Sequence, residues 1–388
     1  MEFNPNDPAN LEDPYPTYYW LREEAPLYHN ADQGFWALSR YRDVETAARN
    51  HSVFSSGGGV ELEVPGWLYG PGSFINSDPP WHDVLRKVVG DRFTPRRISD
   101  HTGTIRQTVA KLLRPILERH TGDIAVEVAR ELPVQVIAEM LGVPEDDRPM
   151  VCRWHNDFYF DRDPGELAMT ANARDALPRI AEYFRALAQD RRSSPRGDLI
   201  SDLVVRGLEG PWADAMDEVL RGLVFLLFSA GSETTHSLIG TMFLLLETYP
   251  EIRELIAKDP SKIPALVEET VRFDSPVQHL ARTTTDAVDL YGETIPSGDR
   301  VLLLFGSANR DERYWPAADS FDPMRRRQHH LGFGVGIHFC LGAPLARLEG
   351  RLVLEEFFAH VVDYEIAGPV IRSTRGTNRG LQSLQIRW

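Results

Sequence analysis

The sequence predicts a mainly α-helical protein with a smaller β-rich part toward its C-terminus. Apolar side chains recur with helical periodicity in three long stretches, at residues 103–119, 176–191 and 215–248. The regular alternation of strand and helix that indicates a doubly wound α/β fold does not occur in the sequence. We therefore expect a helix-rich core over about 80–275, followed by a region of strands and loops over about 276–388.

The C-terminal third carries the β signals. Ala287–Tyr291 and Arg300–Phe305 have the composition of strands, and Pro296-Ser-Gly298 predicts a turn between them. A glycine-rich loop follows at 332–336, and the pattern after it predicts a helix over about 341–359. The expected fold class is therefore mainly α with a minor β-rich lobe.

The composition is that of an acidic globular protein. The chain has 388 residues, with 42 Lys plus Arg against 57 Asp plus Glu, so its net charge is −15. Nucleic-acid-binding proteins normally have a basic surplus, so we expect no nucleic-acid partner. The N-terminus lacks the basic and apolar regions of a secretory signal, and the two cysteines form no CxxC pair. We expect a cytoplasmic protein.

One apolar stretch, residues 223–246, is long enough to span a bilayer. The polar run 232–236, which includes Glu233, lies at its centre. A carboxylate in that position is costly in lipid. We expect a core helix with a polar interruption and no membrane span.

The sharpest chemical feature is the run Phe333-Gly-Val-Gly-Ile-His-Phe-Cys340-Leu-Gly342. It lacks the third glycine of a dinucleotide-binding loop and the Lys-Ser/Thr of a phosphate-binding loop. The run delivers Cys340 to the start of a helix, where free N–H groups and the helix dipole favour a thiolate. A lone thiolate suits the axial position of a haem iron, because the porphyrin supplies the other ligands. A buried, inert cysteine is the alternative.

This run resembles the haem-binding signature F-G-x-G-x-H-x-C-x-G of the cytochrome P450 family, the haem-thiolate monooxygenases. Three further motifs occur in the family's order, so the resemblance covers nearly the whole chain. It implies the cytochrome P450 fold, with a single triangular domain over residues 1–388. It also implies haem b as the cofactor, with Cys340 as its metal ligand and Phe333 and Gly334 as contacts.

The second motif, Ala230-Gly-Ser-Glu-Thr234, resembles the family's A-G-x-[D/E]-T in the helix that crosses the distal haem face. The resemblance implies that Ala230 lies against the haem and that Gly231 leaves room for dioxygen. Thr234 would donate a hydrogen bond to the reduced dioxygen, and Glu233 would supply protons for cleavage of the O–O bond. The alternative is a kink where Ser and Thr bond back to carbonyls of their own helix.

The third motif has a structural role in the family. Glu269 and Arg272 share a helical face, because residues three apart are neighbours on a helix. They resemble the family's E-x-x-R pair, which a later arginine completes. The F-D-P-M-R run that ends at Arg325 resembles that later stretch, so Arg325 is the expected third member and Arg326 its rival. The three side chains would fix the segment that leads to the cysteine.

Four basic side chains are expected around the haem propionates. His82 and Arg86 are four residues apart, so one helical face can present both to an anion. The resemblance implies that these two, together with Arg282 and His338, are the partners of the haem propionates. Taken singly, each of the four could be a solvated surface group.

Electrons must come from separate proteins, because the chain has no ferredoxin-type cysteine spacing and no length left for a flavin domain. Residues 81–97 have a local charge of +3, from Arg86, Lys87, Arg92, Arg96 and Arg97 against two aspartates. The resemblance places this segment, with Arg347 and Arg351, at the proximal haem face. A positive surface there would attract a ferredoxin, whose reductase takes electrons ultimately from NAD(P)H. Ordinary solvated surface is the alternative.

By family position, mostly apolar residues should line the substrate pocket: Trp67, Leu68, Phe74, Phe158, Phe228, Val277, Gln278 and Leu280. Such a lining indicates a hydrophobic organic substrate, although any one of the aromatic residues could equally belong to the core. Steroid, terpenoid, fatty acyl and aromatic substrates all remain open.

The expected activity is the insertion of one oxygen atom from O2 into a C–H bond. One alternative is a haem-thiolate sensor that binds a ligand without oxygenating it. The acid–alcohol pair Glu233 and Thr234 argues against this, because a sensor needs neither residue. Another alternative is a haem-thiolate enzyme that performs desaturation, aryl coupling or peroxide-driven oxidation.

Overall fold

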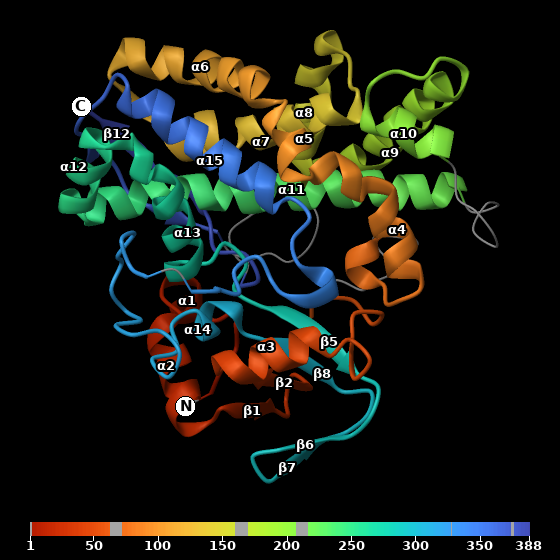
Figure 1. The fold of residues 1–388 in the computed structure, drawn as a ribbon, viewed down its shortest axis with the longest axis vertical. Coiled ribbons are helices and arrows are strands. Elements are labelled where there is room, and N and C mark those ends of the chain that lie inside the picture. The colour runs from red at the N-terminus through yellow and green to blue at the C-terminus, as the bar shows by residue number, and fades with distance from the viewer. Residues whose placement is uncertain (1, 63–71, 160–169, 207–215, 327, 374–375) are drawn as a thin grey trace.

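The computed structural model describes all residues except 1, 63–71, 160–169, 207–215, 327 and 374–375. Helices fill the broad upper part of the molecule and the largest sheet lies in the narrower lower part, which gives a triangular outline (Figure 1). The mainly α fold class with a minor β-rich lobe is confirmed. Within the described ranges, none of the helices combines the length and the apolar character that crossing a bilayer requires.

The helix α11 (Met216–Thr248) runs the full width of the helical part (Figure 1). Its apolar residues on several sides are buried, as expected for a helix that neighbours surround. The helices packed against it include α7 (Glu131–Leu141), α9 (Ala171–Ser193), α13 (Ile263–Phe273) and α15 (Ala343–Phe358). The predicted helices at 103–119, 176–191, 215–248 and 341–359 correspond to α6 (Thr102–Arg119), α9, α11 and α15.

Shorter helices complete the fold. Those of the helical part are α4 (Trp81–Gly90), α5 (Pro95–Ser99), α8 (Arg148–Tyr159), α10 (Leu199–Arg206) and α12 (Pro250–Lys258). Those of the lower part are α1 (Pro8–Glu12), α2 (Tyr15–Glu24), α3 (Tyr41–Arg49) and α14 (Phe305–Ala308).

The largest sheet has the strand order β1-β2-β8-β5-β3. Its strands are β1 (Leu27–Asn30), β2 (Phe35–Leu38), β3 (Phe54–Ser55), β5 (Leu280–Thr284) and β8 (Arg300–Leu303). Strands β2 and β8 pair in parallel, and the other neighbours are antiparallel. The sheet thus pairs an N-terminal segment with strands of the C-terminal third, although the sequence predicted strands only in that third.

The smaller strands refine the prediction for that third. The predicted strand Ala287–Tyr291 corresponds to β6 (Val288–Leu290), which pairs with β7 (Glu293–Ile295). The turn predicted at 296–298 therefore follows β7, a strand that we did not expect. The remaining short strands are β4 (Thr121–Asp123), β9 (Glu365–Ile366), β10 (Ile371–Arg372), β11 (Leu381–Ser383) and β12 (Gln385–Arg387).

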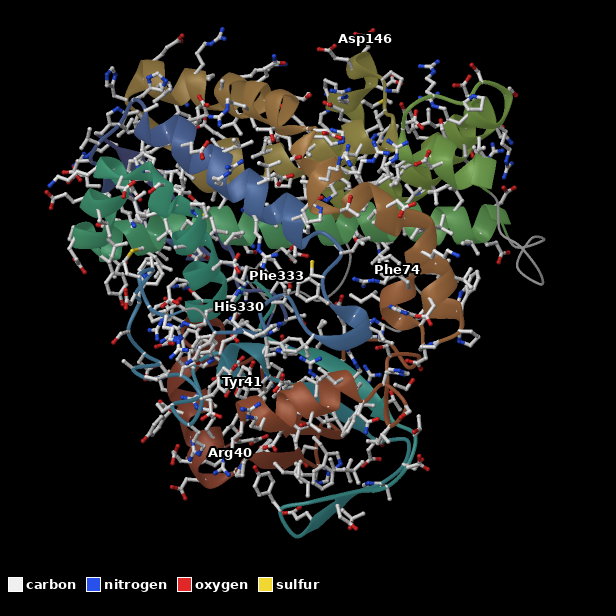
Figure 2. All side chains as sticks on the ribbon, in the orientation of Figure 1. Arg40, Tyr41, Phe74, Asp146, His330 and Phe333 are labelled. Carbon is white, nitrogen blue, oxygen red and sulfur yellow. The ribbon has the colours of Figure 1, made fainter. Side chains whose placement is uncertain are left out.

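The loop before α15 is anchored in both parts of the molecule. Leu331 and Val335 belong to the hydrophobic cluster of the sheet part, whereas Phe333 and Leu341 pack against the core of the helical part. In Figure 2, the labelled Phe333 lies between these two parts. The loop that carries Cys340 is therefore held between them.

Candidate active site

The loop around Cys340 has a defined backbone. The Cys340 N–H donates to the carbonyl oxygen of Phe333 at 2.8 Å, which closes the loop. Gly334 and Gly336 have φ angles of +67° and +74°, in the left-handed region that favours glycine. The half-buried Cys340 follows immediately, three residues before α15 begins at Ala343. This confirms the expected placement of the cysteine before a helix.

The surroundings of the Cys340 sulfur favour the thiol, whereas the sequence predicted a thiolate. Burial raises the pKa of the thiol, while the N–H groups of Gly342 and Ala343 and the charges of Arg86 and Arg347 lower it only in part. The donors expected from the sequence are present, but the depth of burial outweighs them. A metal ligand must be deprotonated, so iron binding at this sulfur would release its proton.

The residues of the second motif lie on one partly exposed face of α11. Ala230 is exposed, and Gly231, Glu233 and Thr234 are half-buried. The Thr234 hydroxyl donates to the carbonyl oxygen of Ala230 at 2.9 Å, and the helix continues unbroken through this point. The hydroxyl oxygen keeps lone pairs that can accept a second hydrogen bond. The back-bond named in the alternative is thus present without the kink. Because it uses the hydroxyl proton, Thr234 in this geometry can accept a further hydrogen bond but does not make the expected donation to dioxygen.

Gly231 has no packing reason to be glycine. Among the described residues, a Cβ built on Gly231 has one neighbour within 4 Å, the Cγ1 of Ile137 at 3.9 Å. Gly332 is the opposite case, because its Cβ would overlap the Val271 Cγ1 and lie 2.8 Å from the Val271 carbonyl oxygen.

We expect Gly231→Ala to fold with wild-type stability and to lose turnover, because the methyl group occupies the space next to Thr234. Gly332→Ala should instead cost about 1–3 kcal/mol of unfolding free energy through overpacking. Thermal unfolding and product formation, measured on both variants, test this contrast. A Gly231→Ala variant that is destabilised yet fully active would contradict it.

The structure brings Glu269, Arg272 and Arg325 together. Arg272 forms a bidentate pair with Glu269 at 2.7 and 2.8 Å, and the Arg325 Nε lies 3.0 Å from Glu269 Oε1. Both arginines also donate to backbone carbonyls between residues 309 and 320, including that of Ser320. The three side chains therefore fasten α13 to the segment that precedes the Cys340 loop.

The four basic residues predicted for the propionates converge. The rings of His82 and His338 have centroids 4.6 Å apart. The Arg86 Nη2 donates to the Phe339 carbonyl oxygen at 2.5 Å, and the buried Arg282 donates to the Ala281 carbonyl oxygen at 2.7 Å. The contacts of His82, Arg86 and His338 place these groups at the loop of Cys340, and Arg282 is close enough for its charge to lower the pKa of His338.

Among the described residues this basic cluster has one direct carboxylate contact, between the His82 Nδ1 and the Asp83 Oδ1 at 2.8 Å. Burial and the positive charges of Arg282, His82 and Arg86 lower the pKa of His338 to about 2, and burial lowers the pKa of Arg282 to about 10. Within the described part of the chain, the buried His82 Nε2 has no hydrogen-bond partner and Arg282 forms no ion pair within 4 Å. A buried guanidinium without a carboxylate partner is costly, so Arg282 and the unpartnered His82 Nε2 fit the carboxylates of a haem.

The predicted pocket residues separate into groups. Trp67 and Leu68 lie outside the described residues. Phe74 packs edge-on against His82, and Phe158 packs against Phe225 of α11. Val277 and Leu280 are partly buried beside the cluster of the sheet part.

Two other predicted pocket residues are almost fully buried. Phe228 is only 1% exposed and packs against His155 and Phe184, on the side of α11 opposite Ala230. Gln278 is 2% exposed, and its Nε2 donates to the Ser275 carbonyl oxygen at 2.7 Å. The structure therefore places Phe228 in the core, because helical geometry turns it away from the distal face.

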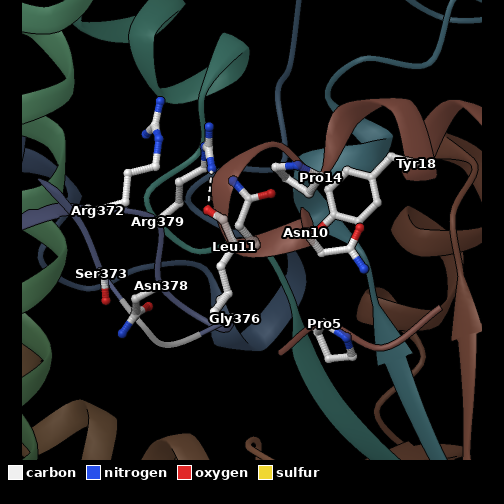
Figure 3. A pocket seen from close by; sticks show the side chains of 12 residues that line it. Pro5, Asn10, Leu11, Pro14, Tyr18, Arg372, Ser373, Gly376, Asn378 and Arg379 are labelled. Carbon is white, nitrogen blue, oxygen red and sulfur yellow. Dashed lines mark hydrogen bonds between the residues drawn. The ribbon is translucent and has the colours of Figure 1, made fainter. Parts of the chain in front are cut away.

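Gln278 lines a small cavity between the N-terminal helices and the C-terminal strands (Figure 3). The cavity has a free volume of about 10 Å³, enough for about one water molecule. Arg379 closes one side and donates to the Leu11 carbonyl oxygen at 3.1 Å. A cavity of this size does not hold an organic substrate, so this cavity gives Gln278 no contact with one.

The basic surface near the loop is more neutralised than the sequence suggested. Arg86 turns inward, Arg92 pairs with Asp202, and Arg347 pairs with Glu268. The exposed cations of this segment are Lys87, Arg96 and Arg97. Arg96 and Arg97 line a polar hollow together with Arg92, Asp91, Thr94, Asp100 and Asp202.

Sequence reasoning missed residues that support the site from a distance. The Ser56 hydroxyl lies 3.0 Å from the His338 Nε2, and the Asp78 carboxylate accepts from the Ser56 N–H at 3.0 Å. Glu268 contacts both Arg347 and His330. These partners are far apart in the chain, so no spacing pattern could have revealed the contacts. The one sequence signal was that a second glutamate, Glu268, directly precedes Glu269.

Comparisons with known proteins agree with this geometry. The cytochrome P450 family model matches residues 262–360. Cytochrome P450 130 of Mycobacterium tuberculosis is 38% identical over 365 residues, which cover 91% of this chain and 89% of the relative. Erythromycin C-12 hydroxylase of Saccharopolyspora erythraea is 38% identical over 344 residues, covering 87% and 85%.

A solved structure shows the same fold. Cytochrome P450 CYP109Q5 from Chondromyces apiculatus superposes with a TM-score of 0.90 at 34% identity and covers 99% of this chain and 97% of its own. Members of the family bind haem through a cysteine thiolate and use it to insert oxygen. The chain belongs to the cytochrome P450 family of haem-thiolate monooxygenases.

Proposed function

We propose that Cys340 is the axial ligand of haem b and that His82, Arg86, Arg282 and His338 hold its propionates. The observation that carries this proposal is the buried basic cluster beside the Cys340 loop, in which the His82 Nε2 has no partner among the described residues. When bound, haem would supply the chemistry of dioxygen binding and reduction. The chain would supply the thiolate, the counter-charges and the face of α11 that carries Ala230 and Thr234.

We propose that Glu233 and Thr234 manage protons on that face. The Thr234 hydroxyl is hydrogen-bonded to the Ala230 carbonyl one turn earlier, and this bond fixes the position of the hydroxyl oxygen on α11. Glu233 is half-buried beside it and can exchange protons with solvent. Gly231 lies one turn before Thr234 on the same face, and among the described residues a Cβ there would meet only the Ile137 Cγ1, so the space is free.

We propose a hydrophobic organic substrate that is hydroxylated at a C–H bond. Phe74 and Phe158, together with the exposed Ala230, support this class, and one relative is named for hydroxylating erythromycin. Screening compounds by their shift of the haem spin state would identify binders. With labelled O2, one labelled oxygen atom is expected in each product molecule, and unlabelled product would contradict the proposal.

We propose that a ferredoxin and its reductase deliver the electrons in the cytoplasm, with NAD(P)H as the source. The exposed Lys87, Arg96 and Arg97 support an acidic partner, because they remain positive after the other local arginines are paired.

The double variant Arg96→Gln/Arg97→Gln should be reduced by such a ferredoxin about tenfold more slowly at low ionic strength, because long-range attraction speeds association. The difference should shrink as salt screens the charges. The matched control is Arg119→Gln/Arg387→Gln, two exposed arginines that are ion-paired elsewhere on the surface. Equal slowing in both double variants would contradict docking at this segment.

A further inference from the structure

Four side chains form a connected cluster beside the Cys340 loop. The Arg347 Nε and Nη2 lie 2.5 and 3.0 Å from the Glu268 carboxylate, and the Arg347 Cζ lies 4.5 Å from the centre of the Phe333 ring. The His330 Nε2 contacts the same carboxylate at 3.2 Å. Figure 2 shows His330 and Phe333 close to each other on the loop. The cluster thus links α13, the loop and α15.

The cluster places a positive charge against the loop of the predicted haem ligand. The Phe333 carbonyl oxygen accepts a hydrogen bond from the Cys340 N–H, and the Arg347 guanidinium lies over the Phe333 ring. The guanidinium thus lies against the loop that carries Cys340, and a positive charge there favours negative charge on the sulfur. The same charge favours the extra electron of the reduced haem.

Glu268 fixes the position of that charge. Although burial raises the pKa of Glu268, the hydrogen bonds from His330 and Arg347 lower it to about 2, so it is ionised in the neutral range. Arg347 is a long side chain with 37% of its surface exposed, and without a partner it would sample several rotamers. A bidentate carboxylate holds the planar guanidinium in one orientation.

We propose that Glu268 is a positioning residue that holds the Arg347 charge over Phe333 and thereby sets the reduction potential of the haem. The proposal rests on the proposed ligation by Cys340. The proposal gives the Glu268–Arg347 ion pair a function beyond stability, to which partly exposed ion pairs contribute little.

The test is a double-mutant cycle on the reduction potential of the haem-loaded protein. Arg347→Gln should shift the potential to more negative values, because a positive charge near the thiolate is lost. In the Glu268→Gln background, the Arg347→Gln shift should fall to less than half, because the arginine is already loose there. An equal shift in both backgrounds, or no shift from Arg347→Gln, would overturn the proposal.

Glu139→Gln is the matched control, because Glu139 and Arg148 form a similarly exposed ion pair at 2.8 Å in the helical part. This variant should leave the potential unchanged, and a shift as large as that of Arg347→Gln would count against the proposal. If Arg347→Gln fails to take up haem, Arg347→Lys replaces it, since lysine keeps the charge but lacks the planar fork. Its smaller negative shift must again fall in the Glu268→Gln background.

Failure of the underlying ligation is recognisable separately. If Cys340 does not ligate the iron, the wild-type protein itself shows the carbon monoxide spectrum of a histidine-ligated haem. The double-mutant cycle is interpreted only on protein with the thiolate spectrum, so the two failures are distinct.

Discussion

Replacing Cys340 by serine should abolish monooxygenase turnover while the chain still folds. Serine is nearly isosteric with cysteine, and the backbone bond from residue 340 to Phe333 does not involve the sulfur. The hydroxyl lacks the electron-rich thiolate that favours cleavage of the O–O bond. Product formation and thermal unfolding, measured side by side, check this expectation.

The matched control is Cys152→Ala. Cys152 is 3% exposed in α8, and burial raises the pKa of its thiol to about 12, so it behaves as a small apolar core residue. Its replacement should retain turnover with a stability cost of about 1 kcal/mol. Turnover that survives Cys340→Ser, or that is lost in Cys152→Ala, would refute the assignment.

Thr234→Ala should uncouple electron consumption from product formation. Without the hydroxyl, protons reach the reduced dioxygen from an undefined direction, so most electrons leave as hydrogen peroxide. We expect product formation to fall about 10²-fold while NAD(P)H is still consumed. Product, peroxide and reductant measured in one assay give the coupling ratio.

Thr248→Ala provides the comparison for this variant. Thr248 makes the same hydrogen bond to the carbonyl four residues earlier, at 2.9 Å, but it lies at the far end of α11. Its coupling should match that of the wild type. Full coupling in Thr234→Ala would show that this hydroxyl does not direct proton transfer.

Periodicity predicted the helices well because each helix buries a continuous apolar stripe or surface. For α6, α9, α11 and α15, most of the predicted ends lie within a few residues of the observed ends. It missed β1 and β2, which are only four residues long, and β2 pairs in parallel with β8 from the opposite end of the chain. Pairing at such separation leaves no local signal.

The motifs predicted which residues meet, but they could not predict partners or orientation. Glu269, Arg272 and Arg325 meet as the pattern indicated, because the pair at i and i+3 was already local. The neutralisation of Arg92 by Asp202 and of Arg347 by Glu268 depends on tertiary packing. Net charge counted along a segment therefore overstates the positive surface that a partner meets.

The visible spectrum of the reduced protein with carbon monoxide tests the central claim, thiolate ligation by Cys340, most directly. The account predicts the far-red Soret band that gives the family its name, and its loss in Cys340→His. A band at the position typical of histidine-ligated haem in the wild-type protein, or a failure to bind haem, would contradict the account.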